Sequence, residues 1–297
     1  YKLPLAGAGI REGILLRQGN RWGDAAPLPG WSRETLDEVR DCLSRCEDLV
    51  PASLRCALEM LEENWTPLRH EVPLNALLDG AENEIFAGAL RAYREGCRCL
   101  KIKTSGVDFA RLPDLLNEVS QVTGNICKLR LDPNRSWSFE ESLRLADKLS
   151  HFPIEYIEEP LADSSRLSEL ISRSACPIAL DETLREISPG ELARFQGAAA
   201  LVLKPTLMGG FARCREFADE GVRLGMNSVV SAAYESGVGI HALGRFAASL
   251  PSISSAGLDT YSRLESDVLV SRLDLSGYIF RADQPLPVID ESRIVLL

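Results

Sequence analysis

The sequence lacks the features of several protein classes. It has no run of about 18 apolar residues, the length that a membrane-spanning helix requires, so we expect no membrane span. Basic residues are the minority, 33 against 43 acidic ones, and the net charge of −10 makes nucleic acid an unfavourable partner. Neither a G-x-G-x-x-G fingerprint nor a P-loop occurs, which argues against a bound nucleotide. Residues 1–11 lack a basic stretch followed by an apolar block, so we expect no signal peptide.

Histidine and paired cysteine are scarce as well. None of the eight cysteines forms a C-x-x-C pair, and the three histidines have no ligand spacing, so a zinc site is not expected. In a chain of 297 residues, scattered cysteines are typical of buried, reduced side chains rather than of a disulfide scaffold. We therefore predict a cytoplasmic protein whose cysteines, at positions 42, 46, 56, 97, 99, 127, 176 and 214, are reduced.

What the sequence does contain, from Val72 onward, is an alternation of short apolar runs and amphipathic stretches of helical length. This alternation predicts βαβ units and a parallel sheet, because parallel strands need a crossover connection. Eight such runs predict a closed α/β barrel. The predicted strands are VPLNALL (72–78), CLKIK (99–103), KLRLD (128–132), IEYIE (154–158), PIALD (177–181), ALVLK (200–204), SVVS (228–231) and AGLD (256–259). Residues 140–149 and 211–224 are two of the predicted helices.

The first part of the chain has a different pattern. We predict a strand over residues 9–18 and a loop over the Gly- and Pro-rich residues 22–31. Ser32 is predicted to cap a helix that continues to Leu49, and a second helix is predicted over residues 52–63. This order is typical of a small α+β unit.

The last part of the chain is also distinct, since residues 261–297 contain alternating segments such as GYIF and ESRIVLL with no partner helix. We therefore place this tail on the N-terminal unit, and predict that the barrel is inserted into a cap built from both ends. The predicted boundaries are 1–70 for the N-terminal part of the capping domain, 71–260 for the barrel and 261–297 for the returning segment.

Charged residues stand at the carboxyl ends of five consecutive predicted strands. A charge in that place can simply be the first solvated residue of a loop. In a barrel, however, the carboxyl ends of all strands meet at one mouth, where active sites lie. Five in succession therefore favour a site. The five residues are Lys103, Asp132, Glu158, Asp181 and Lys204.

The alternation within two strands supports that interpretation. Lys101 and Lys103 are two residues apart, as are Arg130 and Asp132, so each pair points to one side of its strand. If the apolar residues between them face the helices, the charged pairs face the barrel interior. Polar groups are costly there unless they are paired or bind a metal, which favours a functional role.

Three carboxylates that converge from separate strands form a hard, all-oxygen ligand set, which suits Mg²⁺. A lysine beside that ion can act as a base only if its pKa falls well below about 10.4, and the like charge of Lys101 would lower the pKa of Lys103. The ion would stabilise the dianion that forms when a proton leaves the carbon α to a carboxylate. The set therefore predicts a small-molecule carboxylate substrate and metal-assisted enolisation.

The motifs around these residues resemble those of the o-succinylbenzoate synthases, in the muconate-lactonizing-enzyme-like subgroup of the enolase superfamily. The likeness covers nearly the whole chain. It is carried by Lys101-Ile102-Lys103, LRLDPNRSW (129–137), YIEEPL (156–161), ALDETLRE (179–186), VLKPTLMGG (202–210), VVSAAYESGVG (229–239), WGDAAPLPGWS (22–32) and AGLDTY (256–261). The resemblance implies an enolase-type (β/α) barrel, a modified TIM barrel, with an α+β capping domain.

The resemblance also implies a role for each charged residue. Asp132, Glu158 and Asp181 would bind Mg²⁺, with Mn²⁺ as a substitute. Lys103 would remove the α-proton and then protonate the departing hydroxyl on the same face of the substrate. Lys204 would stabilise the enolate from the other side.

Four further residues are substrate-binding candidates by the same resemblance. Ser231 and Gly257 would hold a succinyl carboxylate through a hydroxyl and backbone N–H groups. Arg130 would either approach the substrate or pair with a metal ligand inside the barrel. Arg11, which lies among glycines, would close over the site on a mobile loop.

The implied reaction is the syn dehydration of 2-succinyl-6-hydroxy-2,4-cyclohexadiene-1-carboxylate to o-succinylbenzoate in menaquinone biosynthesis. The same barrel residues serve N-succinylamino acid racemases, dipeptide epimerases and cycloisomerases, so these activities stay open as alternatives. A barrel that binds a small acid without turnover is a further alternative. None of these residues predicts the oligomeric state.

Overall fold

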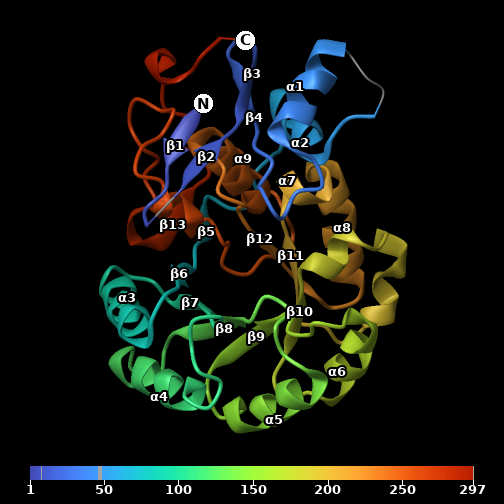
Figure 1. Ribbon diagram of the computed structural model, residues 1–297, viewed down its shortest axis with the longest axis vertical. Coiled ribbons are helices and arrows are strands. Elements are labelled where there is room, and N and C mark those ends of the chain that lie inside the picture. Colours follow the sequence, from blue (N-terminus) through green and yellow to red (C-terminus); the bar gives the residue numbers. More distant parts are fainter. Residues whose placement is uncertain (8, 46–48, 297) are drawn as a thin grey trace.

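A computed structural model describes residues 1–7, 9–45 and 49–296. A curled sheet of seven parallel strands forms its centre, in the order β12-β11-β10-β9-β8-β7-β6, and helices lie around the outside (Figure 1). The predicted α/β barrel class is confirmed. The strands are β6 (Ala76–Leu78), β7 (Cys99–Lys103), β8 (Lys128–Asp132), β9 (Ile154–Glu158), β10 (Ile178–Leu180), β11 (Ala200–Leu203) and β12 (Asn227–Val230).

The eighth predicted strand, AGLD, is not a strand in the structure. The backbone N–H of Ala256 donates to the carbonyl of Pro73 at 2.8 Å, and that of Gly257 donates to the carbonyl of Val230 at 2.8 Å. The chain then turns into a 3₁₀ helix at Asp259, too early for a regular ladder. This segment is hydrogen-bonded to both edges of the sheet, so it closes the barrel in place of an eighth strand.

The helices that follow the strands cover the outer face of the sheet. In α5, for example, Phe139, Leu145 and Leu149 are buried, and the Ser138 hydroxyl caps the helix by accepting the N–H of Glu141 at 3.2 Å. Both predicted helices are confirmed, as α5 and α8. The set is α3 (Glu82–Arg94), α4 (Leu112–Val122), α5 (Phe139–Leu149), α6 (Leu167–Arg173), α7 (Pro205–Met208), α8 (Phe211–Arg223) and α9 (Gly237–Ala248). Short 3₁₀ helices are η1 (Ser164–Arg166), η2 (Glu182–Arg185), η3 (Pro189–Phe195), η4 (Asp259–Arg263), η5 (Ser276–Tyr278) and η6 (Glu291–Arg293).

The two faces of strands β7 and β8 carry different chemistry, as their alternation predicts. Ile102 and Leu131 belong to the core between sheet and helices. Lys101 pairs in register with Arg130, and Lys103 with Asp132, so the four charged residues lie side by side on the opposite face. That face is the barrel interior, and its charges stand at the carboxyl edge of the sheet.

The N-terminal segment differs from its prediction at three points. The expected strand over 9–18 is broken at Gly13 into two strands, and the expected loop over 22–31 starts with strand β4. The Gly- and Pro-rich composition indicates a loop, but Gly23 is there because of close packing within a strand. A Cβ on Gly23 would lie 2.1 Å from the carbonyl oxygen of Ala57. The elements are β1 (Lys2–Pro4), β2 (Ile10–Glu12), β3 (Ile14–Gln18), β4 (Arg21–Ala25), α1 (Leu36–Arg45) and α2 (Ala52–Leu61).

The third difference is the cap of the first helix. Ser32 does not cap it, because its hydroxyl accepts the N–H of Leu28 at 2.8 Å and closes the preceding loop. Thr35 is the cap instead: its hydroxyl accepts the N–H of Glu38 at 3.2 Å, and the Glu38 carboxylate accepts the N–H of Thr35 at 2.7 Å. The second predicted helix is confirmed as α2.

The C-terminal tail runs beside the N-terminal strands, and the two chain ends lie close together in Figure 1. Strand β13 (Ile279–Arg281) pairs antiparallel with β5 (Glu71–Pro73), so the predicted GYIF strand is confirmed in part. The segment ESRIVLL is not a strand, because it opens with the 3₁₀ helix η6. The boundaries of capping domain and barrel stay a prediction.

Two further observations concern the chain as a whole. The cysteines within the described ranges are buried and free, in agreement with reduced core thiols, while Cys46 lies outside those ranges. Among the described residues, no helix combines the length and the apolar character that crossing a membrane requires.

Candidate active site

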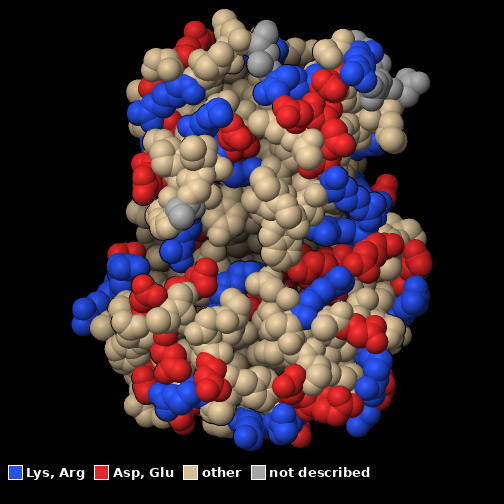
Figure 2. All heavy atoms as spheres, in the orientation of Figure 1, with Lys and Arg blue, Asp and Glu red and all other residues tan. Residues whose placement is uncertain are grey.

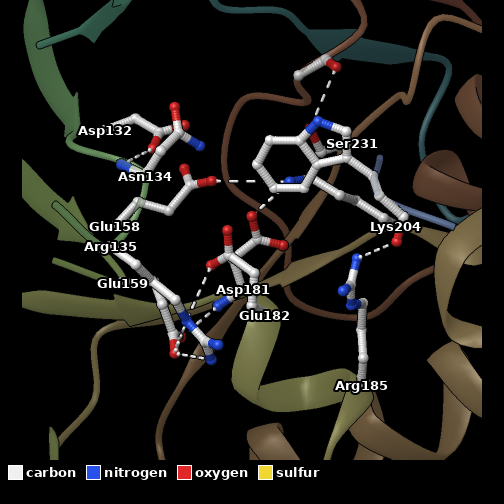
Figure 3. Close-up of polar contacts among 12 residues, drawn as sticks. Asp132, Asn134, Arg135, Glu158, Glu159, Asp181, Glu182, Arg185, Lys204 and Ser231 are labelled. Atoms are coloured by element: carbon white, nitrogen blue, oxygen red, sulfur yellow. Dashed lines mark hydrogen bonds and ion pairs between the residues drawn. The ribbon is translucent and has the colours of Figure 1, made fainter. Parts of the chain in front are cut away.

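The charged residues at the strand ends meet at the mouth of the barrel. Lys101 Nζ lies 2.6 Å from Glu158 Oε2 and 2.8 Å from Asp132 Oδ2. Lys103 Nζ lies 2.7 Å from the same Asp132 oxygen. From the other side, Lys204 forms an ion pair with Asp181 and lies 4.0 Å from Glu158 Oε1 (Figure 3). The two lysines that the sequence assigns to opposite faces of a substrate thus flank one group of carboxylates.

These carboxylates are deeply buried, with exposed fractions of 2% for Asp132, 1% for Glu158 and 3% for Asp181. Buried charge is costly unless it is paired, and removing one partner leaves another uncompensated. Three lysine side chains lie against three carboxylates at one place. An arrangement this costly indicates function rather than stability.

Burial and charge act in opposite directions on the pKa values of this cluster. Burial raises the pKa of Glu158 to about 7, with further help from the negative charge of Asp132 and against the attraction of Lys101. Burial would also raise the pKa of Asp132, but Lys101 and Lys103 outweigh it and hold that pKa below its usual range. Burial lowers the pKa of Lys101, yet its two carboxylate partners raise it well above the ordinary value. Lys101 is therefore held as an ammonium ion.

Asp132, Glu158 and Asp181 are the candidate metal ligands. They offer hard oxygen donors from three neighbouring strands, and a bound cation would offset both the burial and the Asp132 charge that raise the pKa of Glu158. The ammonium groups take up these oxygens in the structure, and no three acidic, histidine or cysteine side chains of the described residues form a ready-made metal cage. The donor set fits a hard divalent cation by its chemistry, and the lysines compete with such an ion for the same oxygens.

A second layer of side chains holds the ligands in place. Glu159, with a positive φ of 35°, turns its carboxylate away from Glu158. One of its oxygens accepts the backbone N–H of Asp181 at 3.0 Å, and the other accepts Arg135 Nη2 at 2.7 Å (Figure 3). Thr183 also donates to this carboxylate. Glu159, which follows the candidate ligand Glu158, thus fixes the backbone of a second candidate ligand, Asp181.

No role for Arg135 or Asn134 was predicted from the sequence. The Asn134 side-chain oxygen accepts Lys103 Nζ at 2.9 Å, so it orients the candidate base together with Asp132. Both missed residues lie in the DPNR segment, directly after β8. Their place in a loop that follows an active-site strand was the available signal.

A cavity of about 160 Å³ opens next to the lysines. The residues that line it include Lys101, Lys103, Lys204, Ser231 and Gly257. A Cβ on Gly257 would lie 2.8 Å from Ser231 Oγ, so only glycine leaves this space open. The face in Figure 2 is hollowed near its middle, with basic and acidic side chains around the hollow. The structure thus brings two of the four substrate-binding candidates to the lysines.

Arg130 lies inside the barrel but is not among the residues that line the cavity. It is fully buried, and its Nε donates to Glu155 Oε2 at 2.6 Å. Its Nη1 donates to Asn75 Oδ1 at 2.9 Å. Of the two expectations for Arg130, the interior ion pair is the one that the structure shows, with Glu155 in place of a metal ligand.

Arg11 does not reach the lysines. Its Nε donates to the carbonyl of Tyr234 at 3.0 Å, and its Nη1 donates to the carbonyl of Pro27 at 2.6 Å. The side chain is 2% exposed, so its donors are taken by backbone carbonyls. Arg11 ties the loop after β4 to the loop after β12, and Tyr234 of the latter lines the cavity.

Comparison with known proteins places this site in a family. The family described as "Enolase C-terminal domain-like" matches residues 84–284. The muconate cycloisomerase of Pseudomonas fluorescens has the same fold, with a TM-score of 0.85 and 18% identity over 98% of this chain and 94% of that one. The chain belongs to the enolase superfamily, and both the predicted resemblance and the enolase-type barrel are confirmed.

Two relatives narrow the assignment within the superfamily. The o-succinylbenzoate synthase of Yersinia enterocolitica (serotype O:8 / biotype 1B) is 32% identical over 295 residues, which cover 92% of this chain and 90% of that protein. The o-succinylbenzoate synthase of Yersinia pestis (strain Pestoides F) is 30% identical over 305 residues, which cover 96% and 90%. Within the superfamily the chain therefore groups with the o-succinylbenzoate synthases, which are carbon–oxygen lyases.

Proposed function

We propose that the protein is an o-succinylbenzoate synthase, which removes water from 2-succinyl-6-hydroxy-2,4-cyclohexadiene-1-carboxylate and so serves menaquinone biosynthesis. The observation that carries the proposal is the pair of lysines on opposite sides of three buried carboxylates at the mouth of the barrel. Relatives that are 30% and 32% identical over nearly the full chain are named for this activity.

Asp132, Glu158 and Asp181 would hold Mg²⁺, or Mn²⁺ as a substitute. When bound, the ion supplies positive charge for the substrate carboxylate as its α-carbon loses a proton. A small-molecule carboxylate also suits the lysine-lined cavity, because its charge is opposite to theirs.

Lys103 is the proposed acid/base catalyst. Its Nζ is oriented by Asp132 and Asn134, at the edge of the cavity. It takes the proton from C1 of the ring, and the bonding pair flows toward the carboxylate. It then gives that proton to the hydroxyl on C6, which departs as water while the ring becomes aromatic. The proton taken and the proton given balance, so Lys103 ends the cycle unchanged.

Lys204 and Lys101 have supporting roles in this proposal. Carboxylate partners, chiefly Asp181, outweigh burial and raise the pKa of Lys204, so it stays an ammonium ion that faces the developing enolate. Lys101 bridges Asp132 and Glu158 and keeps the two like charges together. One lysine thus reacts, and two supply fixed positive charge.

The test is an assay of the purified protein with Mg²⁺ on the diene acid, followed by the change in ultraviolet absorbance. We expect turnover that EDTA abolishes and that Mg²⁺ or Mn²⁺ restores. N-Succinylamino acids are assayed in parallel, since a racemase would use the same enolate chemistry. Fast racemisation without dehydration would overturn the proposal, and so would turnover that EDTA leaves unchanged.

A further inference from the structure

The lining of the cavity includes a polar side chain that has no role in the chemistry described so far. Asn75 lies between β5 and β6, is 1% exposed as a residue, and lines the cavity. Its backbone N–H donates to the carbonyl of Ala256 at 3.0 Å, so its main chain is hydrogen-bonded to the segment that closes the barrel. A Cβ on Gly257 would lie 3.4 Å from Asn75 Oδ1 and 2.8 Å from Ser231 Oγ. Three residues from three parts of the chain therefore converge on one small space.

Arg130 decides which way the Asn75 amide points. A guanidinium group has donors only, so the Asn75 oxygen must face it, and it accepts Arg130 Nη1 at 2.9 Å. Arg130 is itself immobilised by Glu155 and by the carbonyl of Ser255, at 2.6 Å and 2.8 Å. A flip of the amide would bring two donors together, which is unfavourable. The Asn75 NH₂ group is thus directed away from Arg130.

That NH₂ group is a donor without a protein acceptor. None of the described residues accepts a hydrogen bond from Asn75 Nδ2. This nitrogen is not completely enclosed by protein atoms. Since Asn75 lines the cavity, its free donor is accessible to a ligand there. A neutral donor held rigidly beside a hydroxyl and a glycine suits an oxygen of a carboxylate or carbonyl group.

We propose that Asn75 is a substrate-binding and specificity-determining residue, whose Nδ2 donates a hydrogen bond to the succinyl carboxylate of the substrate next to Ser231 and Gly257. Arg130 is the positioning residue that orients it. This proposal rests on the proposed function. It gives the buried Arg130, which does not itself line the cavity, a role in orienting a residue that does.

The test compares two ligands in wild type and in Asn75→Asp. The substitution keeps the shape and the acceptor for Arg130, but it replaces the donor with a negative charge. The probes are o-succinylbenzoate and 2-butanoylbenzoate, in which a methyl group replaces the succinyl carboxylate, and their Kd values are measured by calorimetry with Mg²⁺. In N75D we expect the Kd of o-succinylbenzoate to rise by about ten-fold or more, and that of the butanoyl compound by less than about three-fold.

Steady-state kinetics provides a second test of the role of Asn75. The KM for the diene acid should rise by about ten-fold in N75D, with a smaller change in kcat, because the lost contact is remote from the reacting carbons. The matched control is Asn227→Asp, the same change at an exposed asparagine at the start of β12, and it should leave KM and both Kd values unchanged. If N75D does not fold, Asn75→Ala removes the donor without adding charge and is expected to show the same selective loss.

The outcomes separate the two proposals. If N75D weakens the binding of both ligands equally, or changes neither Kd, the assignment of Asn75 is overturned. Turnover of the diene acid by the wild type would then still support the proposed function. If the wild type neither converts the diene acid nor binds o-succinylbenzoate, the proposed function fails, and the assignment of Asn75 fails with it.

Discussion

Lysine nitrogens and carboxylate oxygens share one small volume at the mouth of this barrel, and single residues there have separable effects. Lys103 touches Asp132 and Asn134 at the cavity edge, whereas Lys204 touches Asp181 on the opposite side. In the proposed function, Lys103 moves a proton and Lys204 holds positive charge. Substitutions at these two positions should therefore differ in size.

We predict that Lys103→Ala lowers kcat for dehydration by about 10³-fold, because the general acid/base is lost. Lys204→Ala should lower kcat by about 10²-fold, the usual effect of one lost electrostatic donor. The absorbance assay on the diene acid measures both. Lys148→Ala, at an exposed lysine of α5, is the matched control with unchanged rates. Dehydration at the wild-type rate by K103A would contradict the assigned role.

For single residues, the sequence predicts which charged side chains lie together at the barrel mouth, but it does not predict all of their hydrogen-bond partners. The strand-end charges are predictable because each follows a recognisable apolar strand. The partners of Arg11 and Arg130 are not, since Arg11 bonds to Tyr234, 223 positions away, and Arg130 to Asn75, 55 positions away. Such contacts depend on how loops from distant parts of the chain pack together, which no local pattern encodes.

Among the elements, strands and helices with clear apolar periods were predictable, and irregular segments were not. Strand β4 contains Trp22-Gly23-Asp24, whose composition is typical of a turn, but packing on α2 makes it a strand. The cap of α1 shifts from Ser32 to Thr35 because a loop takes up the Ser32 hydroxyl. Tertiary contacts override local preference in both cases.

The reassigned cap gives a prediction for α1. Thr35→Ala removes the acceptor for the Glu38 N–H and should lower the free energy of unfolding by about 1 kcal/mol. Urea unfolding followed by circular dichroism measures the loss. Ser44→Ala, at an exposed serine near the end of the same helix, should be neutral or slightly stabilising, since alanine is the better helix former. An unchanged midpoint for T35A would show that Thr35 is not the cap.

The contact between α9 and the tail gives a prediction about pH. Burial lowers the pKa of His241, although its Nε2 lies 3.0 Å from the carbonyl of Gln284. The unfolded chain, with a histidine pKa of about 6.5, therefore binds the proton more readily than the folded one. Stability from neutral His241 is present above about pH 6.5 and is lost as the pH falls through its lowered pKa.

Melting curves of wild type and His241→Gln between pH 5 and pH 8 test this. Glutamine keeps a donor for the Gln284 carbonyl but does not titrate in that range. We expect the wild type to lose more of its Tm toward pH 5 than H241Q does. Parallel pH profiles for the two proteins would count against a buried neutral histidine.

For the whole molecule, the proposed metal site predicts a link between metal binding and stability. Three buried carboxylates from three strands would hold the proposed ion only when the barrel is folded, so we expect Mg²⁺ to stabilise the fold. At about 100 times its Kd the gain is about 2.7 kcal/mol, which for a chain of this size raises the Tm by several degrees.

Calorimetric scans with and without Mg²⁺, at equal ionic strength, measure this shift. Asp181→Asn should abolish it, whereas Asp219→Asn, at an exposed aspartate of α8, should retain it. A Tm that does not respond to Mg²⁺ in the wild type would argue against the metal site. The barrel itself could be predicted at this scale, since regular alternation of strand and helix has few solutions. The return of the tail to β5 was predictable only in outline.

The closing segment around Ala256 and Gly257 has a consequence for the mechanics of the barrel. Single bridges at Leu74, Ser228 and Ser231 join the two edges of the sheet there, where other neighbours share a ladder. Because these bridges are isolated, amide hydrogens along this seam should exchange earlier than those of the regular ladders between β7, β8 and β9. The same seam carries Gly257 and adjoins Ser231 in the cavity. A ligand that contacts both Ser231 and Gly257 would add a further link between the closing segment and β12, so we expect substrate binding to slow exchange of these amide hydrogens.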